Sequence, residues 1–203
     1  DLSQYDNLNP QSIRDALNLS DETEVLLYIG RLAKEKGLTF LLRAFDRIAS
    51  ERNQTRLLLV GEGTEREDLQ EMAEALGIGE RVIFTGTVPH CEIPHYAAAA
   101  DLFVFSSFTE TQGLVLVEAM AAGTPVVAVE APGPMDVLAH GGGVLVPREE
   151  EAFADAVLTL LASPDRLQVL GEQARHATRP YAVDAAIERL LSVYKVAIRA
   201  PIK

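Results

Sequence analysis

The sequence is short of several residue types, and each shortage excludes a class of protein. Tryptophan is absent and Cys91 is the only cysteine among 203 residues, which excludes an intrachain disulfide framework and suits a reducing compartment. The 18 basic residues are outnumbered by 30 acidic ones, giving a net charge of −12. This balance argues against a nucleic-acid partner, because nucleic-acid-binding proteins present basic surfaces. No apolar run approaches the roughly 18 residues that a membrane-spanning helix needs, and no signal-peptide pattern is present.

What the sequence does contain is a series of short, continuous apolar runs. Hydrophobic residues make up 48% of the chain and aromatic residues only 6%, so the core must be aliphatic. Because the runs are continuous rather than alternating, they predict strands buried on both faces, as in a parallel sheet covered by helices. The predicted strands are Val25–Ile29, Arg56–Val60, Val82–Thr85, Leu102–Phe105, Val126–Val129 and Gly143–Val146. Between the first two strands, the apolar stripe over 38–48 predicts an amphipathic helix.

Two sets of residues carry helix-start signals. Asn9 followed by Pro10 predicts the start of a short N-terminal helix, because Asn caps free amides and Pro suits the first helical position. Thr64 and Glu67 predict a capping box at the start of the helix that follows the second strand.

The order of strands and helices predicts one α/β, Rossmann-like domain over residues 1–203. Its parallel sheet of about six strands occupies about 24–146, and two or three C-terminal helices without a further strand occupy about 149–199. In such sheets ligands bind at the carboxyl ends of the strands, so the loops that follow the strands are the candidate site.

The first of these loops, Gly30–Gly37, reads GRLAKEKG and concentrates positive charge. It holds Arg31, Lys34 and Lys36 within an acidic protein. A cationic cluster directly after a strand and beside a helix start is suited to an anion such as a diphosphate. The alternative is a solvated turn whose charges pair with Glu35 and its neighbours, and this window alone does not separate the two interpretations.

The stretch Val82–Pro147 contains no lysine or arginine. A phosphate held there must rely on helix-end amides and on cations from the first loop. Glu110 precedes a helix expected from about Gly113, and Glu118 lies within it. Since helical side chains lean toward the N-terminus, both carboxylates can face one ligand. Carboxylates accept hydrogen bonds from vicinal hydroxyls, which indicates a sugar or ribose. The alternative, two ordinary surface charges, fits this otherwise apolar segment less well.

Other candidate motifs are weaker. The segment GEGTERE over 61–67 matches neither the dinucleotide fingerprint nor the P-loop, and no nucleophile elbow is present. His90, Cys91 and His95 suggest metal ligands at first sight. Pro94 interrupts them and no second His or Cys cluster exists, so no metal site is expected.

Three segments together resemble a known family: GRLAKEKG over 30–37, ETQGLVLVE over 110–118 and EAMAAGTPVVA over 118–128. They are similar to the C-terminal domain of GT-B retaining glycosyltransferases of the GT4 type, also called glycosyl transferase group 1. The similarity runs from about Asp1 to Tyr194. The resemblance implies one half of a GT-B fold that binds a UDP- or GDP-linked hexose donor. It also implies a hexosyltransferase whose sugar or lipid acceptor is bound by an N-terminal domain absent from this sequence.

The resemblance also implies roles for individual side chains. Arg31 and Lys36 match the basic residues that hold the donor diphosphate and stabilise the departing nucleotide. Glu110 matches the carboxylate that contacts the donor sugar, and these three are the implied catalytic residues. Glu118 matches the carboxylate that binds the ribose hydroxyls. No metal or other cofactor is implied.

The resemblance implies further donor contacts in three loops. Gly30 is one of them, and the loop of Gly86, Thr87 and Val88 matches the region that accommodates the base. Gly113, Leu114 and Val115 match residues whose amides contact the sugar–phosphate end.

The sequence departs from the family pattern at ETQG, where the family usually has E-x-F-G. ETQG resembles the glycolipid-forming branch, such as diacylglycerol glucosyltransferases, so a cytoplasmic location with peripheral membrane association of a longer protein is among the expectations. Two alternatives stay open. One is a stand-alone sugar-nucleotide-binding or regulatory module without catalysis, and the other is an epimerase of GT-B shape.

Overall fold

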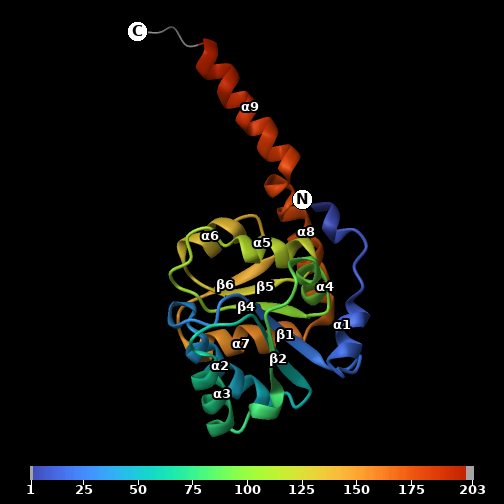
Figure 1. Cartoon of the computed structure of the whole chain (residues 1–203), viewed down its shortest axis with the longest axis vertical. Coiled ribbons are helices and arrows are strands. Elements are labelled where there is room, and N and C mark those ends of the chain that lie inside the picture. The colour runs from blue at the N-terminus through green and yellow to red at the C-terminus, as the bar shows by residue number, and fades with distance from the viewer. Residues whose placement is uncertain (1, 200–203) are drawn as a thin grey trace.

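A computed structural model describes residues 2–199, with side chains described as far as Lys195. Within these residues, six parallel strands form one sheet in the order β3-β2-β1-β4-β5-β6 (Figure 1). The strands are β1 (Glu24–Ile29), β2 (Thr55–Val60), β3 (Val82–Gly86), β4 (Leu102–Phe105), β5 (Val126–Val129) and β6 (Gly143–Val146). Each predicted strand is confirmed to within one residue at either end, and so is the α/β, Rossmann-like class.

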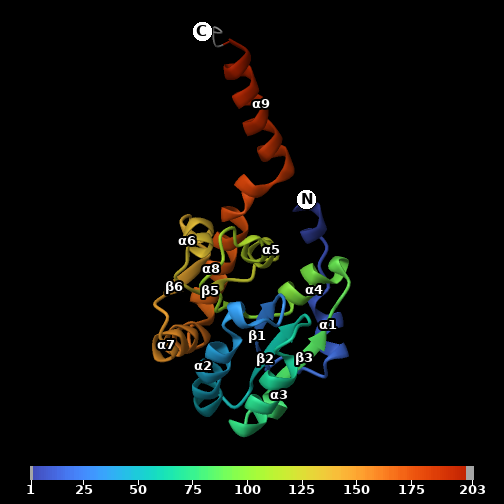
Figure 2. The same ribbon diagram turned by 60° about the vertical axis from the view of Figure 1, so that its left-hand side comes forward.

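Helices occupy the connections and cover the sheet. They are α1 (Pro10–Ala16), α2 (Leu38–Glu51), α3 (Arg66–Ala75), α4 (Ile93–Ala98), α5 (Leu114–Ala121), α6 (Pro132–Leu138), α7 (Glu150–Leu161), α8 (Pro164–Ala177) and α9 (Val183–Arg199). Helix α2 packs between α3 and α7, while α4 packs against α1 and α5 (Figure 2). Helix α8 contacts both α5 and α7, so it joins the two helical groups.

The core is aliphatic with a short run of stacked rings. Val25, Leu27, the side chains of β4 and those of β2 other than Arg56 are essentially buried, as continuous apolar strands require. The ring of Tyr28 stacks on Phe105 at a centroid distance of 6.4 Å, and Phe105 stacks on Phe103 at 6.2 Å. These rings run along β1 and β4, the two central strands.

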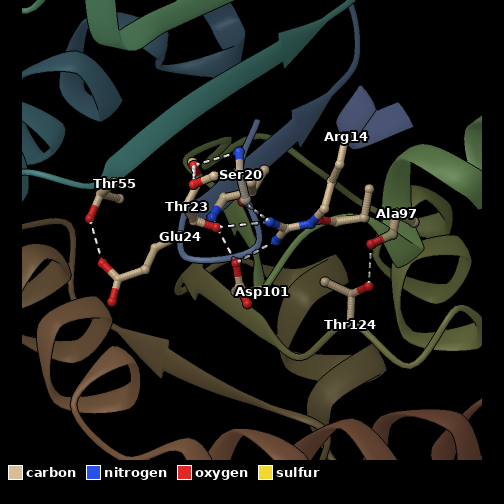
Figure 3. Close-up of polar contacts among 10 residues, drawn as sticks. Arg14, Ser20, Thr23, Glu24, Thr55, Ala97, Asp101 and Thr124 are labelled. Atoms are coloured by element: carbon tan, nitrogen blue, oxygen red, sulfur yellow. Dashed lines mark hydrogen bonds and ion pairs between the residues drawn. The ribbon is translucent and has the colours of Figure 1, made fainter. Parts of the chain in front are cut away.

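Polar side chains fasten the amino edge of the sheet (Figure 3). Asp101, just before β4, accepts a hydrogen bond from the Val25 amide at 2.7 Å and from Arg14 of α1 at 3.3 Å. Glu24, the first residue of β1, accepts hydrogen bonds from Arg52 and from the Thr55 hydroxyl. This edge therefore serves as structural support, and the opposite, carboxyl edge is left open.

The N-terminal helix begins where the sequence predicts. The Asn9 side chain accepts a hydrogen bond from the Ser12 amide at 3.3 Å, and Pro10 is the first residue of α1. The expectation is confirmed.

The predicted capping box at Thr64 and Glu67 is wrong. Helix α3 begins at Arg66, and its cap residue is Glu65, whose side chain makes no capping hydrogen bond. The reason lies in the neighbouring loop, because the Glu65 amide donates to the carbonyl of Leu32 at 3.0 Å. This segment is thereby paired with the loop after β1, and the helix starts two residues later.

Helix α9 extends away from the sheet and its covering helices in both views (Figures 1 and 2). Its apolar stripe is between 49% and 57% exposed at Ile187, Leu190, Leu191 and Tyr194. These four side chains therefore form an apolar stripe that the rest of the described chain leaves uncovered.

Candidate functional site

The candidate site lies where the sheet topology changes direction. Strands β1 and β4 are neighbours, but the chain continues from β1 to β2 on one side and from β4 to β5 on the other. Ligands of open parallel sheets bind in the crevice at such a point, beyond the carboxyl ends of the strands. A cavity of about 420 Å³ opens there. It is lined by Tyr28, Ile29, Gly30, Arg31, Lys36, Phe105, Glu110, Gln112, Leu114 and Val115.

A half-buried ion pair crosses this cavity. Lys36 Nζ lies 3.0 Å from Glu110 Oε2, and the two side chains are 22% and 21% exposed. The other carboxylate oxygen of Glu110 accepts a hydrogen bond from the amide of Gly113 at 3.4 Å. Burial acts to raise the pKa of Glu110, but the hydrogen bonds from Lys36 and Gly113 outweigh it and hold that pKa below its ordinary value. Glu110 is therefore a charged acceptor at neutral pH.

Glycines allow the loop Gly30–Gly37, after β1, and the loop over 106–113, after β4, to approach each other closely. Gly37 caps α2 with a left-handed φ of 68°, and a Cβ at this position would stand 2.6 Å from the carbonyl oxygen of Ser106. The Ser106 hydroxyl in turn donates to the carbonyl of Lys36 at 2.8 Å. Gly113 caps α5 with a φ of 66°. The helix predicted from about Gly113 is confirmed, and its first amides face the loop that carries Glu110.

Arg31 stands at the rim of the cavity. Its side chain is 68% exposed and pairs with Glu35, four residues later. Its carbonyl accepts a hydrogen bond at 3.1 Å from the hydroxyl of Tyr28, a side chain that is fully buried. Burial, together with the nearby charges of Glu110 and Glu35, raises the pKa of Tyr28, so this hydroxyl keeps its proton. Lys34 is exposed and does not line the cavity.

Glu118 lies in a second, adjoining cavity. This cavity has a volume of about 240 Å³ and is lined by Leu2, Gln4, Tyr5, His90, Leu114, Val117, Glu118, Ala121 and Tyr181. Burial raises the pKa of Glu118, although the nearby His90 acts against this. Burial beside Glu118 also raises the pKa of Tyr5, to about 12. Glu110 and Glu118 thus face neighbouring cavities that share Leu114, and one ligand must span both to meet both carboxylates.

The implied base-binding residues lie at the end of β3. Gly86 closes that strand, and its carbonyl accepts a hydrogen bond from the Gly61 amide at 2.9 Å. Thr87 is exposed and Val88 is half-buried. None of these three lines either cavity, but the loop leads directly to His90, which lines the cavity of Glu118.

His90, Cys91 and His95, the residues that suggest metal ligands in the sequence, do not share one site. The His95 ring nitrogen Nδ1 accepts a hydrogen bond from the Asn9 amide, Cys91 is exposed, and His90 lines the Glu118 cavity. Over residues 2–199, no group of three or more His, Cys, Asp or Glu side chains is placed to hold a metal ion. In the same part of the chain, none of the helices combines the length and the apolar character needed to cross a membrane.

Four lining residues were not predicted from the sequence. Tyr28, Ile29 and Phe105 occupy apolar runs and give no local sign of lining a cavity. Gln112 carries a signal, since it stands where the resemblance leads one to expect phenylalanine, and its polar side chain borders the same cavity as Glu110.

Comparison with known proteins decides the family. Residues 10–177 match the family described as "Glycosyl transferases group 1". The chain belongs to this family. The predicted resemblance is thereby confirmed, and the family is one of glycosyltransferase enzymes.

Named relatives cover most of this chain. It is 36% identical over 196 residues to D-inositol 3-phosphate glycosyltransferase 1 of Catenulispora acidiphila, covering 91% of this chain and 47% of that protein. It is 35% identical over 158 residues to alpha-monoglucosyldiacylglycerol synthase of Streptococcus pneumoniae, covering 77% of this chain and 36% of that protein. The chain therefore spans half or less of the length of these relatives.

The fold is also shared with a solved structure that contains a nucleotide. The crystal structure of HepE from Anabaena in complex with UDP superimposes with a TM-score of 0.88 at 27% identity, covering 97% of this chain and 55% of that one. The sheet and its covering helices are thus one half of a GT-B fold.

Proposed function

We propose that this chain is the donor-binding domain of a retaining glycosyltransferase that transfers a hexose from a UDP- or GDP-linked sugar. The observation that carries the proposal is the convergence of Lys36, Glu110 and the start of α5 on one cavity at the carboxyl ends of β1 and β4. This arrangement offers a cation, helix-end amides and a carboxylate within one crevice. Those are the groups that a sugar diphosphate requires.

The phosphates would lie toward Lys36 and Arg31. During transfer, the bond between the anomeric carbon and the diphosphate oxygen breaks, and negative charge accumulates on the departing diphosphate. Two cations and the amides at the N-terminus of α5 would stabilise that charge, because they are already held in place before the reaction. This proposal assigns no step to a metal ion.

The sugar and the ribose would be bound by different carboxylates. Glu110 is charged and half-buried in the larger cavity, so its free lone pairs suit the hydroxyls of the donor hexose. Glu118 lies in the adjoining cavity beside His90, where the ribose and base would extend. A nucleotide diphosphate sugar is long enough to span two cavities that share Leu114. HepE, which shares this fold, was solved in complex with UDP, and this supports a nucleotide as the ligand.

The acceptor, a sugar or a lipid, would be bound by a domain outside this chain. The support is the coverage of the relatives, of which this chain matches 47% and 36%. Bringing an acceptor hydroxyl against the anomeric carbon in a cleft closed to water can supply about 7–11 kcal/mol of the barrier. A donor domain alone is therefore expected to bind donor without transferring it.

Calorimetry tests the donor proposal directly. The chain is titrated with UDP, UDP-glucose, GDP and GDP-mannose, and saturable binding of one nucleotide and its sugar conjugate is expected. Failure to bind any of the four would reject the proposal. Transfer is then assayed with a labelled donor and with sugar or diacylglycerol acceptors, using the chain alone and joined to the preceding half of a relative. Efficient transfer by the chain alone would contradict the division between donor and acceptor domains.

A further inference from the structure

The loop over 106–113, which carries Glu110, is anchored at both ends. At its start, the Ser106 hydroxyl donates to the carbonyl of Lys36. Near its end, the carbonyl of Glu110 accepts a hydrogen bond from the amide of Gly133 at 3.0 Å. These contacts fix the backbone at the two ends of the loop. Between them, on either side of Phe108, the hydroxyls of Ser107 and Thr109 donate to the carbonyl of Glu35 at 3.4 and 3.5 Å.

The side chain of Phe108 is held by a stacked arginine. The guanidinium carbon of Arg148 lies 3.6 Å from the centroid of the Phe108 ring, two residues before Glu110. Arg148 comes from the segment that follows β6, so the contact joins two connections far apart in the sequence. A guanidinium over an aromatic face is attracted by the ring and also covers it from water.

The charge of Arg148 is not engaged in an ion pair with any described residue. Arg148 and Arg43 both line an outer cavity of about 620 Å³. Arg43, unlike Arg148, forms an ion pair with Glu150 at 3.5 Å. Arg43 and Arg47 link α2 to α7 through ion pairs with carboxylates. Arg148 instead packs its guanidinium against the ring of Phe108.

We propose that Arg148 is a positioning residue for the donor sugar. By stacking on Phe108 it adds to the hydrogen bonds of Ser107 and Thr109 that hold the middle of the loop. It thereby helps to keep the Glu110 carboxylate directed at the cavity. The proposal rests on the proposed function, since it assumes that Glu110 contacts the sugar. Without the stack, part of the binding free energy of the sugar would be used to order the loop. Lys36, Arg31 and Glu118 lie outside this loop, so affinity for the nucleotide alone should not change.

The experiment compares the affinity for a nucleotide with that for its sugar conjugate in matched variants. Calorimetry with UDP and UDP-glucose, and with GDP and GDP-mannose, is performed on the wild type, Arg148→Ala, Phe108→Ala and Phe108→Tyr. The two alanine variants should bind the sugar conjugate about twofold to fivefold more weakly and the free nucleotide as before. Phe108→Tyr keeps the ring and should behave as the wild type.

The control for charge is Arg43→Ala, which removes an equal charge from the same outer cavity without touching Phe108. It should leave both affinities unchanged. If Arg148→Ala keeps the wild-type ratio of the two affinities, or weakens both ligands alike, the positioning role is rejected while the donor site stands. If the wild type binds neither nucleotide nor conjugate, the proposed function and this role are rejected together.

Discussion

Lys36 and Glu110 form an ion pair across the cavity at the carboxyl ends of β1 and β4, with Nζ and Oε2 3.0 Å apart. The cation expected to meet a phosphate and the carboxylate expected to meet a sugar thus hold each other in position. Such pre-arrangement lowers the cost of ordering the site when the donor binds. It also means that a change at either residue alters the environment of the other.

The first prediction concerns the three cations of the first loop. Arg31→Ala or Lys36→Ala should weaken the binding of UDP or GDP by about 1.5–3 kcal/mol, because each loses a charge-assisted contact with the diphosphate. Lys34→Ala is the matched control, since Lys34 is exposed and does not line the cavity. Calorimetry on the three variants checks the prediction, and equal losses in all three would refute these assignments.

The second prediction separates the two carboxylates. Glu118→Ala should weaken the binding of the free nucleotide and of the nucleotide sugar, because Glu118 lies in the cavity assigned to the ribose. Glu110→Ala should weaken only the sugar-bearing ligand, by about 1–3 kcal/mol. The measurement is a pair of titrations for each variant. A loss of plain UDP or GDP affinity in Glu110→Ala as large as in Glu118→Ala would show that the roles are drawn incorrectly.

Much of this fold could be predicted from local patterns, since buried parallel strands produce continuous apolar runs whose ends coincide with β1 to β6 within one residue. Gly37 and Gly113 each adopt a left-handed conformation at a helix start. Glycine is favoured there, so both positions could be recognised in the sequence as the ends of loops. Patterns of this kind depend only on neighbouring residues.

Contacts between distant segments could not be predicted in this way. The capping box at Thr64 was wrong because the amide of Glu65 is drawn to the carbonyl of Leu32, in a loop far away in the sequence. The ring of Phe108 and the guanidinium of Arg148 meet only because β4 and β6 belong to one sheet. Tyr28 appears in the sequence as a core residue, and only the fold brings it to the cavity that Lys36 and Glu110 also line.

The third prediction is that nucleotide binding does not require a divalent ion. The proposed phosphate contacts come from Lys36, Arg31 and the amides at the start of α5. Treatment of the chain with a chelator should therefore leave the calorimetric affinity for UDP or GDP unchanged. Loss of binding on chelation, with recovery on adding Mg²⁺ or Mn²⁺, would contradict the prediction.

The fourth prediction links stability to pH through Glu24. Burial acts to raise the pKa of Glu24, but hydrogen bonds from Arg52 and Thr55 outweigh it and lower this pKa from its ordinary value of 4.5. Since the folded-state pKa is depressed, the stabilisation is present above about pH 4.5 and is lost as pH falls through the lower, folded value. Glu24→Gln should lose about 0.5–1.5 kcal/mol at neutral pH and much less at acidic pH.

Urea unfolding of the wild type and of Glu24→Gln at a series of pH values provides the measurement. The difference between the two isolates Glu24 from the other acidic residues that titrate in the same range. Glu71→Gln, on the exposed side of α3, is the control and should show no such difference. A stability difference between the wild type and Glu24→Gln that stays constant with pH would refute the prediction.

The last prediction concerns Tyr28, whose buried hydroxyl donates to the carbonyl of Arg31 at 3.1 Å. Tyr28→Phe keeps the ring that stacks on Phe105 and removes only this hydrogen bond, which leaves the Arg31 carbonyl without that donor. The folded state should lose about 1 kcal/mol, and the affinity for UDP or GDP should fall about threefold to tenfold, because Arg31 is held less firmly beside the phosphates. Tyr96→Phe is the matched control, since Tyr96 is a buried tyrosine on α4 that lines neither cavity. Thermal unfolding and calorimetry on both variants distinguish the two effects. If Tyr28→Phe lowers stability but binds nucleotide as tightly as the wild type and Tyr96→Phe, the hydroxyl supports the fold alone and does not position Arg31.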